Sequence, residues 1–280
     1  MNLPIHPLSI IRYNHKGLSS ADDLVVVEEP MEIRLGYGPI DVREEEAIAI
    51  TMRTPGNDFE LAVGFLFSEG ILRDKDDILS VKYCFSGSKG QKEKNSVRVD
   101  LLPNCIPDLN MQKRNFFAHS GCGICGKASI DAVFKTISHT AIGNPIKLAI
   151  EDLLKIPEKS LKHQVNFNNT GGIHSAAVFD SRGKMIAIKE DVGRHNAVDK
   201  VLGHLLLLGK ANLSDKILFL SGRMGFELVQ KASMASIPII VSVGAPTSLS
   251  VNMGKELGMT LIGFTRKDKF NVYCGAERIS

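Results

Sequence analysis

The sequence has no long hydrophobic run and few cysteines, and each absence excludes a class of protein. No segment approaches the roughly 18 consecutive apolar residues of a membrane span, and the N-terminus lacks the basic region and apolar stretch of a secretory signal. The five cysteines are an odd, scattered set rather than the paired framework of a secreted disulfide-rich fold. A cytoplasmic protein without a membrane anchor is therefore expected.

An excess of charge of one sign is also lacking. The 34 basic and 31 acidic residues nearly cancel to a net charge of +3, so composition gives no general affinity for nucleic acid. Hydrophobic residues make up 44% and charged residues 23% of the chain, which is the balance of a folded globular protein. A length of 280 residues allows one large domain or two modest ones.

Alternating and apolar runs in the first hundred residues predict strands around one helix. The helix follows Pro55-Gly56, with Asn57 as its N-cap and Glu60 completing a capping box, and it ends near Gly70. Strands are expected at residues 24–27, 32–35, 47–53, 81–85 and 97–101, with a polar hairpin tip at 86–95. Prolines and polar residues then interrupt the pattern, so a small α+β domain spanning residues 1–115 is predicted.

In residues 116–280 helical and strand patterns alternate after a strand hairpin. Helices are expected at about 127–137, 151–163, 197–208, 227–235 and 248–257, and strands at 173–179, 185–189, 217–220, 237–243, 260–264 and 270–273. This order predicts a layered α/β domain.

Four segments that follow strands have a shared composition of small residues and arginine. They are residues 191–196, 221–224, 244–247 and 264–267. Ligands of such sheets bind outside the carboxyl ends of the strands. Three of the segments open a helix, whose N-terminus favours anions, and Arg194, Arg223 and Arg266 can pair with phosphate. The four segments together predict a site for a phosphate-bearing ligand.

Two histidines lie beside these segments. His174 follows the polar turn Thr170-Gly-Gly-Ile and His195 lies in the segment 191–196, and either imidazole can carry a proton near neutral pH. The simpler interpretation is an ordinary hydrogen-bonded histidine, which fits His195 better than His174. No Walker loop occurs, and Gly121–Gly126, the literal Gly-x-Gly-x-x-Gly, follows no clear strand, so ATP hydrolysis and nicotinamide chemistry gain little support.

The sharpest local motif is Ser120-Gly-Cys-Gly-Ile-Cys-Gly126, which precedes a predicted helix. A thiolate at a helix N-terminus beside Lys127 should have a lowered pKa, and a nucleophilic thiolate can accept sulfur as a persulfide. The alternatives are a structural metal half-site, a redox disulfide or unreactive cysteines. Zinc would need two more ligands, and no second Cys-x-x-Cys exists, so no metal is predicted.

Several blocks together resemble the formate dehydrogenase accessory sulfurtransferases, the FdhD/NarQ family. The resemblance covers most of the chain and is carried by residues 54–71, 122–126, 170–177, 190–200, 221–223, 245–249, 263–266 and 271–273. It implies a cytidine-deaminase-like α/β domain behind the smaller N-terminal domain. The zinc ligands of deaminases, His-x-Glu and Pro-Cys-x-x-Cys, are absent from the sequence, so deaminase chemistry is not expected.

The resemblance also implies a function. Members of the family take persulfide sulfur from a cysteine desulfurase and pass it to the molybdenum cofactor, bis-molybdopterin guanine dinucleotide, which then enters formate dehydrogenase. By this resemblance Cys122 is the persulfide cysteine and Cys125 its partner in relay or resolution. The residues expected to bind the cofactor are Phe264, Thr265, Arg266, Lys267, Asp268 and Lys269, with Arg223, Arg194 and His174 from the neighbouring segments.

Two other functions are compatible with parts of the sequence. A non-catalytic carrier of the molybdenum cofactor is the main alternative, and a thiol-disulfide oxidoreductase is disfavoured because the cysteine pair is not in the strand-to-helix turn of a βαβ unit. The sequence also departs from the family pattern at two positions. Gly225 stands where relatives often have serine, and His119 precedes the cysteine loop where small polar residues are usual. A homodimer is compatible with the sequence.

Overall fold

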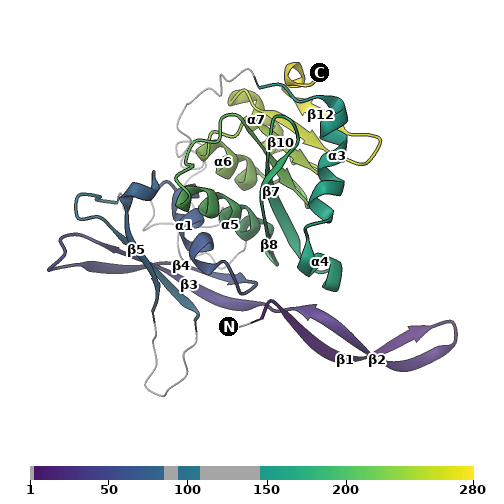
Figure 1. Cartoon of the computed structure of the whole chain (residues 1–280), viewed down its shortest axis with the longest axis horizontal. Coiled ribbons are helices and arrows are strands. Elements are labelled where there is room, and N and C mark those ends of the chain that lie inside the picture. Colours follow the sequence, from purple (N-terminus) through teal and green to yellow (C-terminus); the bar gives the residue numbers. More distant parts are fainter. Residues whose placement is uncertain (1–2, 85–93, 108–145) are drawn as a thin grey trace.

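The computed structural model describes residues 3–84, 94–107 and 146–280 of the chain. Within these ranges it is a mixed α/β protein with two larger sheets and a projecting two-stranded arm (Figure 1). The α/β class predicted from the sequence is confirmed, whereas a cytidine-deaminase type of layering stays a prediction. None of the helices in these ranges is long and apolar enough to cross a membrane.

The first sheet has four strands in the order β4-β3-β6-β5, and β3 runs parallel to β6. Its inner face carries apolar side chains such as Ile33, Val97 and Val99, which are fully buried. All four strands overlap the predicted ranges; their bounds are β3 Glu29–Tyr37, β4 Glu44–Arg53, β5 Ile78–Tyr83 and β6 Ser96–Leu101, with the 3-10 turn Lys75–Asp77 before β5.

Helix α1 (Asp58–Ser68) covers this sheet, but its N-terminus differs from the prediction. Asn57 occupies the N-cap position in the left-handed conformation, with φ of 58°, and its side chain makes no capping hydrogen bond. Instead, Asn57 Nδ2 donates to Glu60 Oε1 at 3.1 Å. The predicted capping box is therefore wrong, because it requires an extended N-cap backbone.

The second sheet has six strands in the order β12-β11-β10-β9-β7-β8. Strands β9, β10 and β11 are parallel, while β7, β8 and β12 each run antiparallel to the strand beside them. Each strand was predicted from its apolar run; the bounds are β7 His174–Asp180, β8 Met185–Asp191, β9 Lys216–Leu220, β10 Ile239–Ser242, β11 Thr260–Gly263 and β12 Asn271–Cys274.

Helices cover both faces of this sheet (Figure 1). Apolar side chains of α5, α6 and α7 form one core with α1 and the first sheet, whereas Leu153 and Ile156 of α3 pack on the other face against Phe179 and Phe219. The helix bounds are α3 Ile150–Leu161, α4 Val165–Thr170, α5 Arg194–Leu207, α6 Phe226–Met234 and α7 Ser248–Glu256, with the 3-10 turn Ala276–Arg278 at the C-terminus. Of these, the short helix α4 was not predicted.

Helices α1 and α5 cross at two glycines. A Cβ atom on Gly64 would lie 1.8 Å from the Asp199 carbonyl oxygen, and one on Gly203 would lie 1.9 Å from the Glu60 carbonyl oxygen. Only glycine allows the backbones to approach so closely. The first sheet, α1 and the helices on one face of the second sheet therefore share one core. The predicted boundary at residue 115 lies outside the described residues and stays a prediction.

Candidate functional site

The carboxyl ends of β9, β10 and β11 lie at one edge of the second sheet, because these strands are parallel. Strand β7 is antiparallel to β9, so its first residue, His174, lies at the same edge, and so does the end of β8 at Asp191. The four loop segments predicted to act together therefore meet here. Three of them lead into α5, α6 and α7, as predicted.

Hydrogen bonds join the loops side by side. Gly244 N donates to the Gly222 carbonyl at 3.2 Å, and Phe264 N donates to the Gly244 carbonyl at 3.1 Å. The buried Ser242 hydroxyl also donates to the Gly222 carbonyl, at 2.6 Å. The contacts leave no space for larger residues, since a Cβ on Gly244 would lie 2.8 Å from the Arg223 Cα. At this edge of the sheet the loop backbones therefore lie side by side, and the close approach of the first two loops requires glycine at position 244.

His174 lies on this surface, close to Gly222. A Cβ on Gly222 would be 3.1 Å from His174 Nδ1, so the glycine makes room for the imidazole. Burial lowers the pKa of His174, and the positive charges of Arg194 and His195 lower it further. The ring is therefore neutral at pH 7 and able to accept a hydrogen bond or a proton.

His195 has a structural role in the described part of the chain. Its Nε2 lies 2.8 Å from Glu227 Oε2 on α6. This contact agrees with the simpler interpretation of His195 as a hydrogen-bonded histidine, and it ties the start of α5 to the first turn of α6.

Two predicted binding residues have buried polar atoms without a hydrogen-bond partner among the described residues. They are Nε of Arg194 and Oγ1 of Thr265, whose side chain is only 1% exposed. A buried polar group without a partner is costly, so such groups often mark the place of a ligand or ordered water. The neighbouring Phe264 has φ of 53° and an exposed ring, so both its backbone and its side chain are unusual for a residue used only in folding.

The basic residues predicted at the site are exposed at its rim. Arg223 follows β9, while Arg266, Lys267 and Lys269 follow β11 with Asp268 among them. Arg266 is oriented by its own surroundings, because its Nη1 donates to the Val243 carbonyl at 2.8 Å and to the Thr265 carbonyl at 2.9 Å. An anion at this edge would meet positive charge from two neighbouring loops.

The chain is similar in sequence to proteins of one known family. A model of the FdhD/NarQ family matches residues 26–280. A protein named sulfur carrier protein FdhD from Streptomyces avermitilis is 44% identical over 274 residues, covering 97% of this chain and 94% of that protein. The protein of the same name from Thermoplasma volcanium is 44% identical over 269 residues, covering 96% and 93%.

The chain belongs to the FdhD/NarQ family. The fold agrees with this, since a crystal structure described as a candidate formate dehydrogenase accessory protein from Desulfotalea psychrophila superimposes with a TM-score of 0.75. That structure is 22% identical and the match covers 99% of this chain and 100% of the other, so it supports the shared fold alone.

The cysteine pair of the FdhD/NarQ pattern, Cys122 and Cys125, lies outside the described residues, as do His119, the helix predicted at 127–137 and most of the hairpin tip at 86–95. Two of the remaining cysteines are poor nucleophiles. Burial raises the pKa of Cys274, whose Sγ donates to the Met259 carbonyl. Burial, followed by the contact with Asp77, raises the pKa of Cys105. Both thiols stay protonated at neutral pH.

No group of three or more His, Cys, Asp or Glu side chains in residues 3–84, 94–107 and 146–280 could hold a metal ion. The absence of a bound metal stays a prediction, because the cysteine pair is not part of these ranges.

A buried ion pair that was not predicted from the sequence supports the site. Lys200 Nζ lies 2.7 Å from Asp191 Oδ2 and donates to the Thr54 carbonyl at 2.7 Å, and both charged side chains are at most 1% exposed. Asp191 also accepts bonds from the backbone N of Thr54 and Gly193. The available signal was the charged pair Asp199-Lys200 between Val198 and Val201 of α5.

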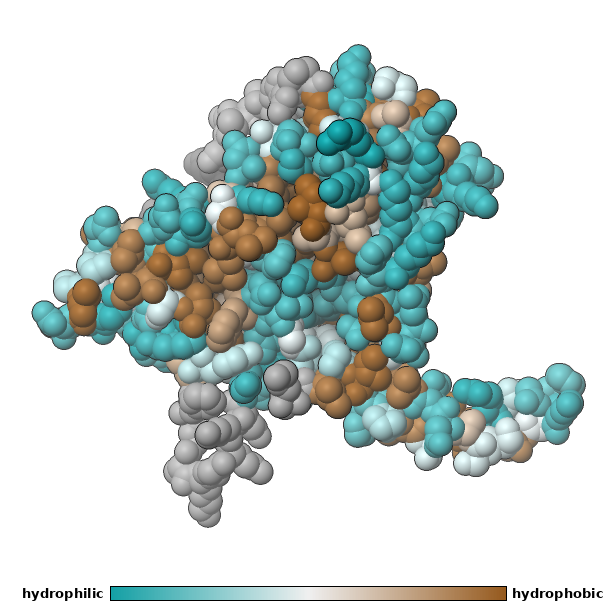
Figure 2. All heavy atoms as spheres, in the orientation of Figure 1, coloured by the Kyte–Doolittle hydropathy of each residue, from teal (hydrophilic) through white to brown (hydrophobic). Residues whose placement is uncertain are grey.

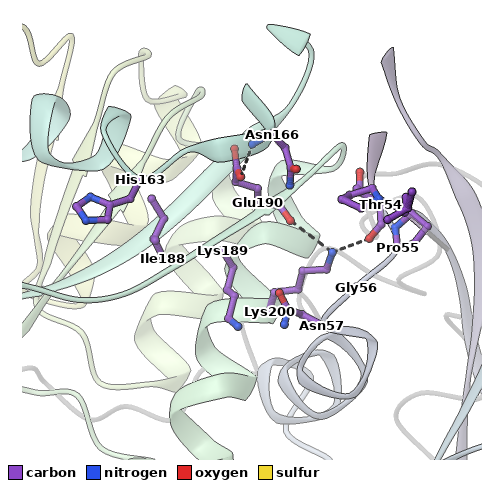
Figure 3. Close-up of a pocket in the computed structure, with 12 residues that line it drawn as sticks. Thr54, Pro55, Gly56, Asn57, His163, Asn166, Ile188, Lys189, Glu190 and Lys200 are labelled. Carbon is purple, nitrogen blue, oxygen red and sulfur yellow. Dashed lines mark hydrogen bonds between the residues drawn. The ribbon is translucent and has the colours of Figure 1, made fainter. Parts of the chain in front are cut away.

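A pocket of about 380 Å³ lies beside this ion pair, between the end of β8 and the loop that leads into α1 (Figure 3). Lys200 reaches from α5 to the carbonyls of Thr54 and Glu190, and the Glu190 carboxylate accepts bonds from the backbone N of Asn166 and Phe167. The pocket is lined by residues 54–57 and by residues 188–190, and none of the residues predicted to bind the cofactor lines it.

Gly225, which stands where relatives often have serine, lies at an open position of the backbone. Gly225 is the N-cap of α6 with φ of −83°, and no atom lies within 4 Å of the position of an added Cβ. A serine would therefore fit here without strain.

Proposed function

We propose that this protein is a sulfurtransferase that accepts persulfide sulfur from a cysteine desulfurase and passes it to the molybdenum cofactor, bis-molybdopterin guanine dinucleotide, for formate dehydrogenase. The observation that carries the proposal is the edge of the second sheet, where unpartnered Arg194 and Thr265 atoms lie among exposed arginines and lysines. Two phosphate groups of a dinucleotide suit such a surface. Membership in a family whose relatives are named sulfur carriers supports the sulfur chemistry.

The residues of the sheet edge hold and orient the dinucleotide in this proposal. Arg223 and Arg266 pair with its phosphates, Arg194 Nε and Thr265 Oγ1 donate to its polar groups, and neutral His174 accepts a proton or a hydrogen bond. Phe264 offers an exposed ring on which a guanine base can stack. Lys267 and Lys269 add positive charge, which attracts the anionic cofactor.

The sulfur step uses Cys122 as a thiolate. Its sulfur attacks the terminal sulfur of the desulfurase persulfide, a new S–S bond forms on Cys122, and the desulfurase cysteine leaves as a thiolate. Cys125 then attacks the Cys122 sulfur. A Cys122–Cys125 disulfide forms, the terminal sulfur leaves at the oxidation level of sulfide beside the bound cofactor, and an external thiol reduces the disulfide.

Mass spectrometry of the intact protein tests this function. After incubation with a cysteine desulfurase and cysteine, the wild type should gain a sulfur adduct that a reductant removes, and Cys122→Ala should not. Cys84→Ala is the matched control, because Cys84 directly follows β5 of the first sheet and its removal should leave loading unchanged. Loading of Cys122→Ala would reject Cys122 as the carrier. Absence of loading on every form would favour a carrier that binds the cofactor without chemistry of its own.

A further inference from the structure

Two pairs of titratable side chains lie between helices α5 and α6. The surface over α3 is hydrophilic, as expected where charged side chains face water (Figure 2). The pairs between α5 and α6 are different, because they are largely buried. The side chains of His195 and Glu227 are 17% and 13% exposed, and those of Asp199 and Lys231 are 2% and 8% exposed. Burial of charge has a desolvation cost, so these pairs require a role other than solvation of the surface.

The two pairs join the helices at successive turns. His195 and Asp199 are four positions apart on α5, and Glu227 and Lys231 are four positions apart on α6. The lower pair lies in the core, where Lys231 Nζ is 2.8 and 2.9 Å from the two Asp199 carboxylate oxygens and the Ser68 hydroxyl of α1 donates to Asp199 at 2.8 Å. The upper pair, with 2.8 Å between Nε2 of His195 and Oε2 of Glu227, lies in the first turn of both helices, at the edge of the second sheet.

The first turns of α5 and α6 start without a capping side chain. Helix α5 begins after Gly193 and α6 begins after Gly225, and glycine has no side chain that could accept a bond from the free N–H groups of the first turn. Helix α7 differs, since the Thr247 hydroxyl accepts such a bond. The contact between His195 and Glu227 therefore supplies a fixed point at the start of both uncapped helices.

The upper pair also lies beside two arginines of the candidate site. Arg194 directly precedes His195, and Arg223 lies four residues before Glu227. By charge alone Glu227 works against an anionic ligand, since a carboxylate near a phosphate repels it. Its Oε1 is nevertheless buried, with no hydrogen-bond partner among the described residues. An unfavourable charge at this place is explained if Glu227 serves to position its partner.

We infer that Glu227 is a positioning residue of the candidate site. It accepts a hydrogen bond from His195 Nε2, holds the first turn of α5 against that of α6, and so sets the spacing between Arg194 and Arg223. The phosphates of one dinucleotide are a fixed distance apart, so two arginines from separate segments bind them together only when those segments keep a matching distance. The inference rests on the proposed binding of a dinucleotide at this edge and adds the residue that makes the site rigid.

Calorimetry of the full chain with guanosine diphosphate tests the inference. Glu227→Ala removes both the charge and the contact, and it should weaken binding roughly tenfold. Glu227→Gln removes the charge but can still accept a bond from His195 Nε2, so its affinity should equal or slightly exceed that of the wild type. His195→Ala should weaken binding as Glu227→Ala does. The double alanine variant should bind no more weakly than either single variant, because all three proteins lack the same contact.

Ser68→Ala is the matched control, since it removes a hydrogen bond from the lower pair. Its melting temperature should fall while its affinity for guanosine diphosphate stays that of the wild type. Tighter binding by both Glu227→Ala and Glu227→Gln would overturn the inference, because the carboxylate would then act by its charge alone. Wild-type affinity in Glu227→Ala, or an equal loss of affinity in Ser68→Ala, would overturn it as well.

The wild type separates this inference from the proposed function. A wild type that binds no guanosine diphosphate would reject the proposed cofactor site, and the positioning role would fall with it. A wild type that binds the probe, together with a Glu227→Ala protein that binds it equally well, would reject the positioning role alone.

Discussion

Lys200 and Asp191 form a buried ion pair with 2.7 Å between Nζ and Oδ2, and together they fasten the start of α5 to the loop that precedes α1. The segment between them carries Arg194, so the pair anchors the loop that holds this residue of the candidate site.

Removing one partner of this pair should be strongly destabilising. Lys200→Met keeps the length of the side chain but leaves the Asp191 carboxylate buried without its cation, and we expect the free energy of unfolding to fall by about 3–5 kcal/mol. Urea denaturation measures the change. The exposed Lys210→Met should change stability by less than about 0.5 kcal/mol. Equal effects of the two variants would show that the pair does not support the fold.

The crossing of α1 and α5 predicts a second large effect. Gly64→Ala places a Cβ against the Asp199 carbonyl and should lower the free energy of unfolding by about 3 kcal/mol, since backbone atoms must move. Gly225→Ala, at an open position with negative φ, is the matched glycine control. A Gly64→Ala protein as stable as the control would contradict the close approach of these helices.

The pH dependence of His174 has a definite sign. Burial lowers the pKa of His174 below its ordinary value of 6.5, so the unfolded chain binds the proton more strongly. The contribution of His174 to stability should fall as the pH drops through 6.5 and level off below the folded pKa. NMR titration of the Cε1 proton, assigned with His174→Gln, gives the folded pKa, and a value above 6.5 would contradict the described burial. Burial also lowers the pKa of His204, which therefore adds a pH dependence of the same sign. The part due to His174 is the difference between the free energies of unfolding of wild type and His174→Gln, measured as a function of pH.

Nucleotide affinity should depend on the arginines of the sheet edge. Arg223→Ala and Arg266→Ala should each weaken binding of a guanosine diphosphate probe by roughly 10–100-fold, the loss expected for a charge-assisted hydrogen bond. Calorimetry measures the affinity. Arg182→Ala, on the exposed turn between β7 and β8 at the other end of these strands, should bind as the wild type does. Unchanged affinity in both edge variants would remove them from the site.

A Thr265 variant can show whether the hydroxyl of this residue serves ligand binding or folding. Its buried hydroxyl has no partner among the described residues, so Thr265→Val should keep or slightly raise the melting temperature while weakening binding of the same probe. Loss of stability in this variant would mean that the hydroxyl serves the fold instead.

Much of the second sheet could be predicted from the sequence, because β9, β10 and β11 are short apolar runs and a helical pattern precedes each of them. The order of strands and helices also predicted that Arg194, Arg223 and Arg266 lie at one edge of the sheet, because parallel strands have their carboxyl ends at the same edge. The prediction did not need any side-chain detail.

The missed features are those whose stability comes from distant contacts. Strand β1 (Ile5–Asn14) was not predicted, because His6, Pro7 and Arg12 interrupt its pattern and none of its residues is fully buried. Asn57 has the residue type of a side-chain cap but a left-handed backbone. Lys200 and Asp191 are charged residues, which pattern analysis assigns to the surface, and their burial depends on a loop more than 130 positions earlier in the chain.

The contact between Gly64 and Gly203 also sets an order of events during synthesis. The two glycines are 139 residues apart, so at roughly 5–20 residues per second the ribosome takes roughly 7–28 s to make α5 after α1. Throughout that interval α1 lacks helix α5, the helix that it crosses in the finished fold. The first sheet and α1 thus leave the ribosome before the helix that completes their core has been made. Until α5 is synthesised, the nascent chain depends on chaperones to protect this apolar surface from aggregation.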